Sequence, residues 1–218
     1  MGVRAHWEKR YTGRESSELS WYEASPQTSM AMIEVLGLGF EAAIIDVGGG
    51  TSALAGELVD AGYRDVSVVD ISSAALARAR AQGGESAERI RWIQADVRVD
   101  GLGRTYDLWH DRAVFHFMVE ATDRARYLQT LKRSLRPGGH LIIATFGPDG
   151  PAQCSDLPVS RYGPDELASV LGADFRPVSS MLREHRTPSG RSQQFLHAHL
   201  RHRAPTTPGR DRGPATAR

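Results

Sequence analysis

The segment of residues 42–52 constrains the fold more than any other part of the chain. It is an apolar run rich in β-branched residues that passes through Asp46, ends in Gly48-Gly49-Gly50 and continues into an amphipathic stretch. This order predicts a buried strand, a tight turn and a helix N-terminus, where backbone N–H groups and the helix dipole face a ligand. Glycine lets the turn bend sharply and lets a ligand approach the backbone. We therefore expect a nucleoside-cofactor site here.

Strands and helices alternate along the rest of the chain. Further strands are predicted over residues 66–70, 90–96, 106–111 and 140–146, and helices over residues 25–36, 53–61, 72–81, 123–135 and 164–171. The first three of these strands end in an acid. Such alternation predicts right-handed βαβ units and a mainly parallel sheet with helices on both faces. Two last strands, 176–185 and 193–201, are joined only by a turn sequence, which predicts a C-terminal antiparallel hairpin.

The length of 218 residues suits a single domain, expected over residues 1–202. Residues 1–40 are expected to form an N-terminal helical lid. Residues 203–218, rich in Pro, Gly, Thr and Arg, are expected to be a disordered tail.

Charge and composition exclude several classes of protein. The formal net charge of +1 gives no electrostatic case for nucleic-acid or membrane partners. The single cysteine, Cys154, excludes an internal disulfide framework and a cysteine-rich zinc site. Because no apolar run approaches a membrane span and the charged N-terminus lacks the apolar core of a signal peptide, we expect a cytoplasmic protein.

Two cofactors fit a glycine turn followed by an acid about 20 residues later. Residues 48–53 match the dinucleotide fingerprint, in which Asp70 would bind the ribose hydroxyls. Asp46 opposes that choice, since a carboxylate at the strand end would repel a pyrophosphate but would attract an ammonium. Asp96, a third acid at a third strand end, suits an adenine amino group or a ribose. The terminal hairpin is also absent from ordinary dinucleotide domains. S-Adenosylmethionine, a zwitterionic nucleoside with a cationic sulfonium, satisfies all three features.

Over about residues 1–201 the sequence resembles the class I S-adenosylmethionine-dependent methyltransferases. The resemblance rests on the glycine turn and on three later motifs in the expected order, at residues 68–72, 94–97 and 135–142. Segments 6–11, 20–22 and 110–117 resemble a small bacterial branch and, more loosely, eukaryotic protein-lysine methyltransferases. The lysine enzymes have Asp-Lys-Gly-Thr where this chain has Asp111-Arg112-Ala113-Val114. The resemblance implies a Rossmann-like α/β fold with a seven-stranded, mostly parallel sheet, helices on both faces and the C-terminal hairpin.

The resemblance also assigns roles to residues. It places Gly48, Gly49 and Gly50 against the amino-acid part of the cofactor with Asp46 nearby, and Asp70 on the ribose hydroxyls. It packs Ile71 on the adenine and sets Asp96 and Val97 around it. Asp111 is expected to face the methionine portion or the substrate. Trp21 is a candidate to cradle the sulfonium by cation–π attraction, with core packing as the alternative.

Methyl transfer from a sulfonium needs a base only if the nucleophile arrives protonated. His110 and His116 flank Asp111 where such enzymes bind substrates, so these three residues are the catalytic candidates; packed or surface histidines are the alternative. No metal site is expected, although His185, His197 and His199 are a weak candidate set. Cys154, in the proline-rich loop of residues 147–162, is interpreted as structural.

The sequence thus predicts in-line methyl transfer from S-adenosylmethionine to an unidentified acceptor, expected to be a small molecule. A protein lysine is the alternative acceptor. A nicotinamide-dependent oxidoreductase is less favoured because no Tyr-x-x-x-Lys dyad is present. A cofactor-binding protein without turnover is a further alternative.

Overall fold

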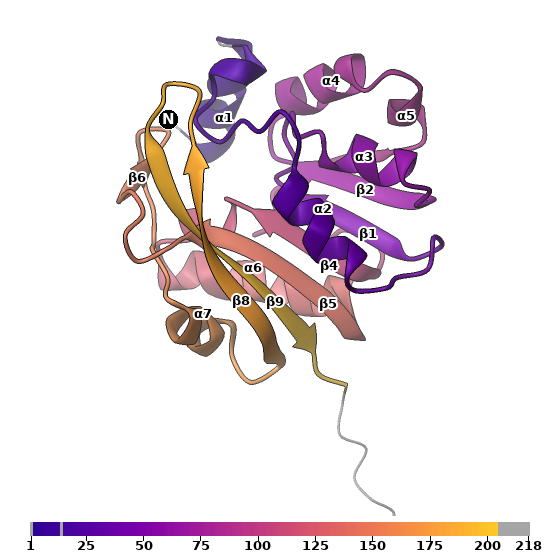
Figure 1. Ribbon diagram of the computed structural model, residues 1–218, viewed down its shortest axis with the longest axis vertical. Helices are drawn as coiled ribbons and strands as arrows, with labels where there is room; N and C mark the ends of the chain where they lie inside the picture. Colours follow the sequence, from indigo (N-terminus) through magenta and orange to yellow (C-terminus); the bar gives the residue numbers. More distant parts are fainter. Residues whose placement is uncertain (1, 14, 205–218) are drawn as a thin grey trace, which may run out of the picture.

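A computed structural model describes residues 2–13 and 15–204. Its centre is a seven-stranded sheet in the order β3-β2-β1-β4-β5-β9-β8 (Figure 1). The strands of this sheet are β1 Ala43–Val47, β2 Asp65–Asp70, β3 Arg91–Gln94, β4 Tyr106–Arg112, β5 Leu135–Phe146, β8 Phe175–Arg186 and β9 Ser192–His202. Strands β1 to β5 pair in parallel, as the alternating pattern predicts. The Rossmann-like fold expected from the sequence is therefore confirmed.

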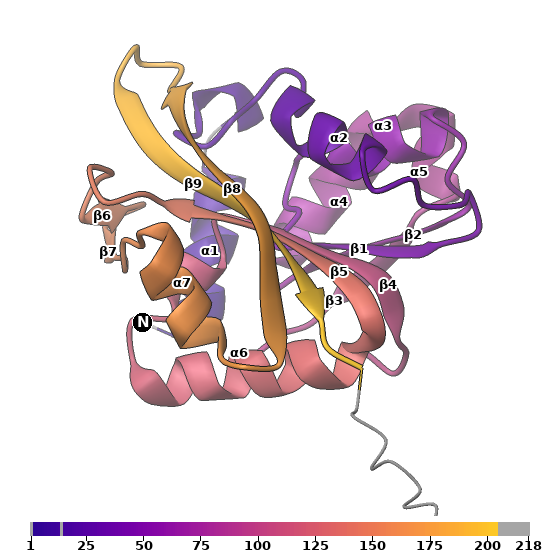
Figure 2. The same cartoon turned by 60° about the horizontal axis from the view of Figure 1, so that its bottom comes forward.

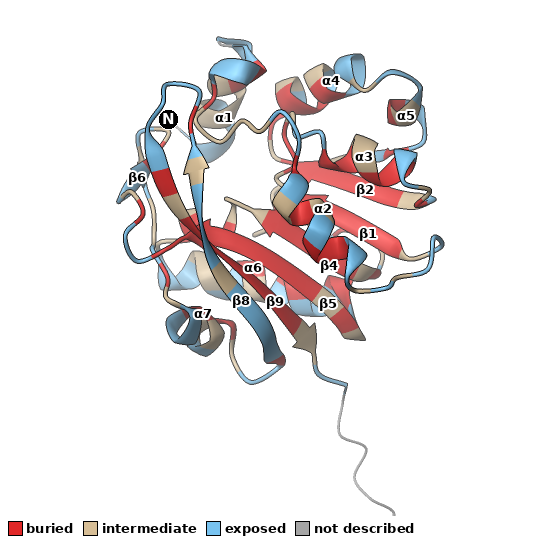
Figure 3. Cartoon of the chain, viewed as in Figure 1, coloured by how far each residue is buried: buried red, intermediate tan, exposed pale blue. Residues whose placement is uncertain are grey.

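Helices cover both faces of the sheet (Figure 2). They are α1 Val3–Thr12, α2 Gln27–Glu34, α3 Leu54–Asp60, α4 Ser73–Gln82, α5 Gly84–Glu88, α6 Ala121–Ser134 and α7 Pro164–Leu171. On one face, α6 and α7 bury Tyr127 and Leu167 against Trp109 of β4. On the other, α2 and α3 bury Ile33 and Leu58 among the apolar residues of β1 and β2. Strand β1, at the centre of the sheet, is buried along its whole length, which agrees with its mostly apolar sequence (Figure 3).

The C-terminal hairpin is confirmed, and its placement adds a detail. Strand β9 pairs antiparallel with both β5 and β8, so it lies inside the sheet. Strand β8 forms the edge and is mostly exposed (Figure 3). The last strand of the sequence thus runs against its neighbours, while the edge strand runs parallel to β5.

Several element boundaries differ from the prediction. Residues 25–36 were expected to be helical with Pro26 in the first turn, but the helix begins at Gln27 and Pro26 occupies the cap. Strand β5 begins at Leu135, which pairs with Tyr106 of β4, and the Pro-Gly-Gly segment forms an irregularity before the regular pairing resumes at His140. The expected loop of residues 147–162 contains a small two-stranded sheet, β6 Gln153–Cys154 and β7 Leu157–Pro158.

The N-terminal residues form α1 and a 3₁₀ turn, Ser16–Glu18, which lead into α2. The carboxylate of Glu8 on α1 accepts hydrogen bonds from the N-terminus of α4, including the backbone N–H groups of Ser73 at 2.7 Å and Ala74 at 3.0 Å. Arg10, two residues later, pairs with Asp156 between β6 and β7. Helix α1 is therefore fastened to two segments distant in sequence.

The predicted tail lies, from residue 205 onward, outside the described residues. Among the residues that the structure does describe, none of the helices combines the length and the apolar character needed to cross a bilayer.

Candidate active site

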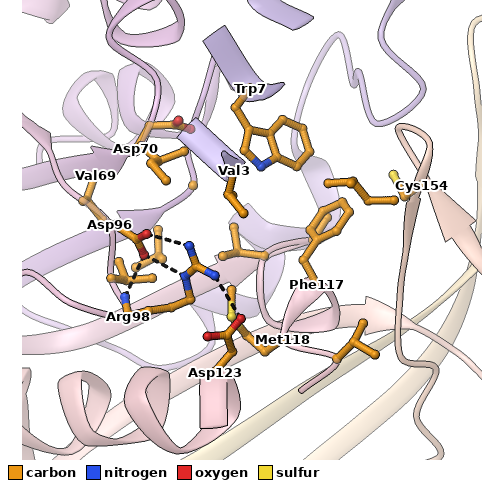
Figure 4. Close-up of a pocket in the computed structure, with 18 of the residues that line it drawn as sticks. Val3, Trp7, Val69, Asp70, Asp96, Arg98, Phe117, Met118, Asp123 and Cys154 are labelled. Carbon is orange, nitrogen blue, oxygen red and sulfur yellow. Dashed lines mark hydrogen bonds and ion pairs between the residues drawn. The ribbon is translucent and has the colours of Figure 1, made fainter. Parts of the chain in front are cut away.

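A cavity of about 300 Å³ lies at the carboxyl ends of β1, β2 and β4, beneath α1. Such crevices at the strand ends are where open α/β sheets bind ligands. Six of the predicted cofactor-binding residues line it: Trp21, Gly48, Asp70, Ile71, Asp96 and Val97. Figure 4 shows Trp7 of α1 and Phe117 next to each other on one side of the cavity. Asp70, Asp96 and Arg98 lie on its other side. Gly48 of the glycine turn, Asp70 and Asp96 thus line one cavity.

The glycine turn leaves no room for side chains. Gly48 and Gly50 have φ of +63° and +53°, a region that other residues rarely adopt. A Cβ at Gly48 would lie 2.0 Å from Cγ2 of Val114, and one at Gly50 would lie 2.3 Å from the hydroxyl of Tyr11. A Cβ at Gly49 would lie 2.7 Å from Oδ2 of Asp46. The turn is therefore a close-packed cradle whose backbone is open to an approaching ligand only because it lacks side chains.

Asp70 ends β2 and is only 7% exposed. Burial raises the pKa of Asp70 to about 7, against hydrogen bonds from the backbone of Ser72 and Gly50, while the charges of Asp46 and Glu8 add to the increase. A buried carboxylate that still accepts hydrogen bonds at the rim of a cavity is suited to bind hydroxyl groups. This geometry fits the ribose role that the sequence suggests for Asp70.

Asp96 and Val97 line the far end of the cavity, where Asp96 is held by Arg98 (Figure 4). Nη2 of Arg98 lies 2.7 Å from Oδ2 of Asp96, and Nη1 lies 2.9 Å from Asp123 at the start of α6. Partial burial opposes ionisation, but the Arg98 hydrogen bonds and charge keep the pKa of Asp96 below its ordinary value. Arg98 was not singled out from the sequence, although its position two residues after Asp96 was a signal for this pairing.

Asp46 and His110 do not face the main cavity. Oδ1 of Asp46 lies 2.7 Å from Nδ1 of His110, whose Nε2 lies 2.9 Å from the hydroxyl of Ser29 on α2. All three line a smaller cavity of about 40 Å³ on the other side of Gly48. His110 was expected to contact the acceptor as a base. Both ring nitrogens of His110 are hydrogen-bonded to Asp46 and Ser29, and a base role for His110 stays a prediction.

Asp111 and His116 are also placed away from the cavity, contrary to expectation. Asp111 is fully buried, accepts hydrogen bonds from the backbone N–H of Val114 at 3.0 Å and Phe115 at 3.4 Å, and is bonded by the hydroxyl of Tyr127. It therefore shapes the turn after β4. Residues alternate across a strand, so Asp111 points to the opposite face from its neighbours His110 and Arg112.

His116 is fully buried among aromatic rings, with Phe146 at 4.6 Å and Phe117 at 4.5 Å between ring centroids. Its Nδ1 accepts a hydrogen bond from the backbone N–H of Phe146 at 3.3 Å. Burial, with the charge of Arg112, lowers the pKa of His116 to about 3. A histidine that stays neutral and does not line the cavity is a poor candidate for the predicted base, so the packing alternative describes it better.

Arg112 is a site residue that the sequence reasoning missed. It lines both cavities, donates from Nη1 to the backbone carbonyl of Trp21 at 2.9 Å, and pairs through Nη2 with Glu23 at 2.9 Å. The strand alternation that places His110 on this face also places Arg112 there, and this signal was available from the sequence. Phe117 and Cys154 complete the end of the cavity near Trp21.

The three histidines considered as a metal set are not assembled. Nε2 of His185 lies 2.8 Å from the backbone carbonyl of Ser20, and Nε2 of His199 lies 2.9 Å from Nδ1 of His140. Within residues 2–13 and 15–204, no group of three or more His, Cys, Asp or Glu side chains is arranged to hold a metal ion.

Residues 44–139, from β1 through the start of β5, match the model of the methyltransferase domain family. This stretch contains the glycine turn and the acids Asp46, Asp70 and Asp96. In this stretch the chain is similar to S-adenosylmethionine-dependent methyltransferases. Solved structures that this fold resembles include methyltransferases with bound S-adenosylhomocysteine, a product of S-adenosylmethionine.

A curated relative of this chain is the malonyl-[acyl-carrier protein] O-methyltransferase of Halalkalibacterium halodurans. It is 32% identical over 112 residues, which are 49% of this chain. The match spans only 40% of the relative's length.

Solved methyltransferase structures resemble the whole fold. A protein from Anabaena variabilis has a TM-score of 0.75 at 17% identity, with 93% of this chain and 96% of that chain covered. The 1,6-didemethyltoxoflavin-N1-methyltransferase of Burkholderia thailandensis, solved with bound 1,6-didemethyltoxoflavin and S-adenosylhomocysteine, has a TM-score of 0.68 at 22% identity. The coverage there is 93% of this chain and 88% of that chain. At these identities the likeness concerns the fold.

Proposed function

We propose that this protein transfers a methyl group from S-adenosylmethionine to a small-molecule acceptor bound in the cavity beneath α1. The observation that carries the proposal is that Gly48 of the glycine turn, Asp70 and Asp96 line one cavity. A zwitterionic nucleoside offers groups that complement each of them.

Residues at successive strand ends would each contact a different part of this cofactor. The ribose hydroxyls would donate to Asp70, and the adenine would lie between Ile71 and Val97 with Asp96 near its amino group. The methionine part would lie over Gly48, where the main cavity meets the smaller one that holds Asp46. Arg112 lines both cavities, so a carboxylate there would have a cation nearby, while Asp46 supplies the anion for an ammonium.

The cofactor supplies a methyl group that its sulfonium already activates, so the chain has to position the acceptor and exclude water. Trp7 and Tyr11 of α1, with Trp21 and Phe117, form an aromatic wall over the cavity. The ring centroid of Trp7 lies 5.8 Å from that of Trp21 and 5.1 Å from that of Phe117, and both pairs of rings are in edge-on contact. Such rings keep water out and attract a sulfonium by cation–π interaction.

The acceptor would occupy the end of the cavity beyond Trp21, which Phe117, Cys154, Leu157 and Pro158 line. These side chains favour an acceptor with an apolar body. An enclosed, mostly apolar cavity is typical of small-molecule sites. The bound 1,6-didemethyltoxoflavin of the Burkholderia protein is a ligand of that kind, which supports a small molecule over a protein side chain.

Calorimetric titration with S-adenosylhomocysteine and, separately, with NAD tests the cofactor assignment. We expect S-adenosylhomocysteine alone to bind, at micromolar affinity or tighter, and Asp46→Ala combined with Gly50→Val to abolish the binding. Gly56→Ala is a matched control, since a Cβ at Gly56 on α3 meets no atom within 4 Å. Binding of NAD alone would overturn the proposal. With binding established, a screen of small apolar acceptors with labelled cofactor tests the transfer itself.

A further inference from the structure

Residues 19–23, here called the strap, separate the two cavities. Its Trp21 lines both the main cavity and the smaller one around Asp46. The strap is a turn closed by the hydrogen bond from the Tyr22 N–H to the Leu19 carbonyl at 2.9 Å, and Leu19 is buried against the domain. Because the strap has no regular secondary structure on either side of Trp21, the position of the indole depends on what holds the strap backbone.

Two side chains from distant strands hold that backbone. Arg112 of β4 donates to the carbonyl of Trp21, and His185 of β8 donates from Nε2 to the carbonyl of Ser20 at 2.8 Å. Nδ1 of His185 also lies 3.7 Å from the carboxylate of Glu23, which pairs with Arg112. Consecutive carbonyls on the strap are thus bonded from the sheet centre and from the hairpin.

Neighbouring side chains hold the ring of His185 in position for this contact. Its side chain is 9% exposed, and its ring packs edge-on against Phe195 of β9 at 6.0 Å between centroids. Arg112 stacks over the same Phe195 ring, with its guanidinium carbon 5.0 Å from the centroid. Phe195 therefore holds His185 and Arg112 in place relative to each other. Through these two donors the C-terminal hairpin is connected to the strap.

We propose that His185 is a positioning residue of the methyl-transfer site: it holds the strap so that Trp21 stands over the junction of the two cavities, where the sulfonium would lie. The effect on cofactor binding rests on the proposed function. The contact between His185 and the strap does not. It gives the C-terminal hairpin a part in cofactor binding, although His185 does not line either cavity.

The test compares His185→Phe, which keeps a ring but removes the donor, with His185→Gln, which can place a side-chain N–H near the Ser20 carbonyl. His199→Gln is the matched control, because His199 lies on the same hairpin but contacts His140 instead of the strap. The measurements are S-adenosylhomocysteine affinity by calorimetry and hydrogen exchange of the Tyr22 amide. Should His185→Phe not fold, His185→Ala replaces it in the comparison.

We expect His185→Phe to weaken the affinity by about three- to tenfold and to speed exchange at Tyr22, the scale of one lost hydrogen bond. His185→Gln should restore most of both, and His199→Gln should change neither. In a Trp21→Ala background, His185→Phe should cause no further loss of affinity, because it acts through Trp21. A full additional loss in that background, or unchanged Tyr22 exchange in His185→Phe, would overturn the inference. Failure of the wild-type protein to bind S-adenosylhomocysteine would instead overturn the proposed function and leave the exchange result to be judged alone.

Discussion

Replacing Glu8 by alanine tests how far the N-terminal helix contributes to cofactor binding. Glu8 accepts four hydrogen bonds at the start of α4: two from the backbone N–H groups of Ser73 and Ala74, and two from the hydroxyls of Ser72 and Ser73. Partial burial works against ionisation of Glu8, but these bonds outweigh it and lower the pKa. Ser72 in turn donates its N–H to Asp70 at 2.8 Å. One carboxylate thus joins α1 to the loop that carries the predicted ribose ligand.

The size of the effect follows from these contacts. A side chain that caps a helix N-terminus contributes roughly 0.5–2 kcal/mol, and its charge adds about 0.3–1 kcal/mol through the helix dipole at an exposed position. Glu8 is partly buried. We therefore expect Glu8→Ala to weaken the packing of α1 against the rest of the domain by about 1–2 kcal/mol. Trp7 and Tyr11 of α1 line the cavity, so the affinity for S-adenosylhomocysteine should fall by about 5- to 30-fold.

The assay is calorimetric titration of Glu8→Ala with S-adenosylhomocysteine, combined with hydrogen exchange over α1. Lys9→Ala is the control, because Lys9 is the exposed neighbour of Glu8 on the same helix. Because the folded-state pKa of Glu8 is lowered, the stabilisation is present above the unfolded-state pKa and is lost as the pH falls through the folded-state pKa. If Glu8→Ala bound the ligand as tightly as Lys9→Ala and exchanged no faster in α1, the coupling of α1 to the cofactor site would be refuted.

The remaining predictions concern three side chains, those at positions 50, 70 and 116. Gly50→Ala should lose at least tenfold in S-adenosylhomocysteine affinity, because its Cβ would meet the Tyr11 hydroxyl at 2.3 Å, whereas Gly56→Ala should bind normally in the same titration. Affinity should rise between pH 6 and pH 8, since Asp70, with its pKa raised to about 7, accepts ribose hydroxyls best when ionised; a rise that persists in Asp70→Asn would contradict this. Asp70→Asn should also raise the Tm by about 2–4 °C at pH 8, where the wild-type protein buries a charge, and calorimetry checks it. His116→Asn should leave the pH profile of binding unchanged from pH 5 to pH 9, because the pKa of His116 is lowered to about 3; a shifted profile would restore it as a candidate base.

The sheet was predictable because the signals for it are local. Strand β1 and the turn after it are apolar and glycine-rich, and the acids Asp70 and Asp96 follow their strands at the spacing that brings them to one edge. The hairpin followed from a four-residue connection, which leaves no room for a parallel crossover. The position of β9 inside the sheet had no local signal, since it depends on which edge the hairpin meets.

The surroundings of the catalytic candidates were not predictable from the sequence, because their partners come from elsewhere in the chain. His110 is taken up by Asp46 and Ser29, which are 64 and 81 residues away in sequence. Asp111 is bonded by Tyr127 of α6, and a histidine next to it in sequence points to the other face of the strand. Alternation along β4 could have separated Asp111 from Arg112, but only the assembled sheet shows which face meets the cavity.

The interior position of β9 has a consequence for how the chain can be made. In the described sheet, β8 pairs only with β9, and β9 joins it to β5, so the strand that follows all others in chain order connects the edge of the sheet to the rest. While residues 192–202 are still inside the ribosome, β5 has an open edge and β8 has no neighbour. The sheet, and with it the position of β8 from which His185 holds the Ser20 carbonyl, is therefore completed only after all other strands have been synthesised. A chain that stops before β9 would lose two strands and expose the apolar edge of β5 to other chains.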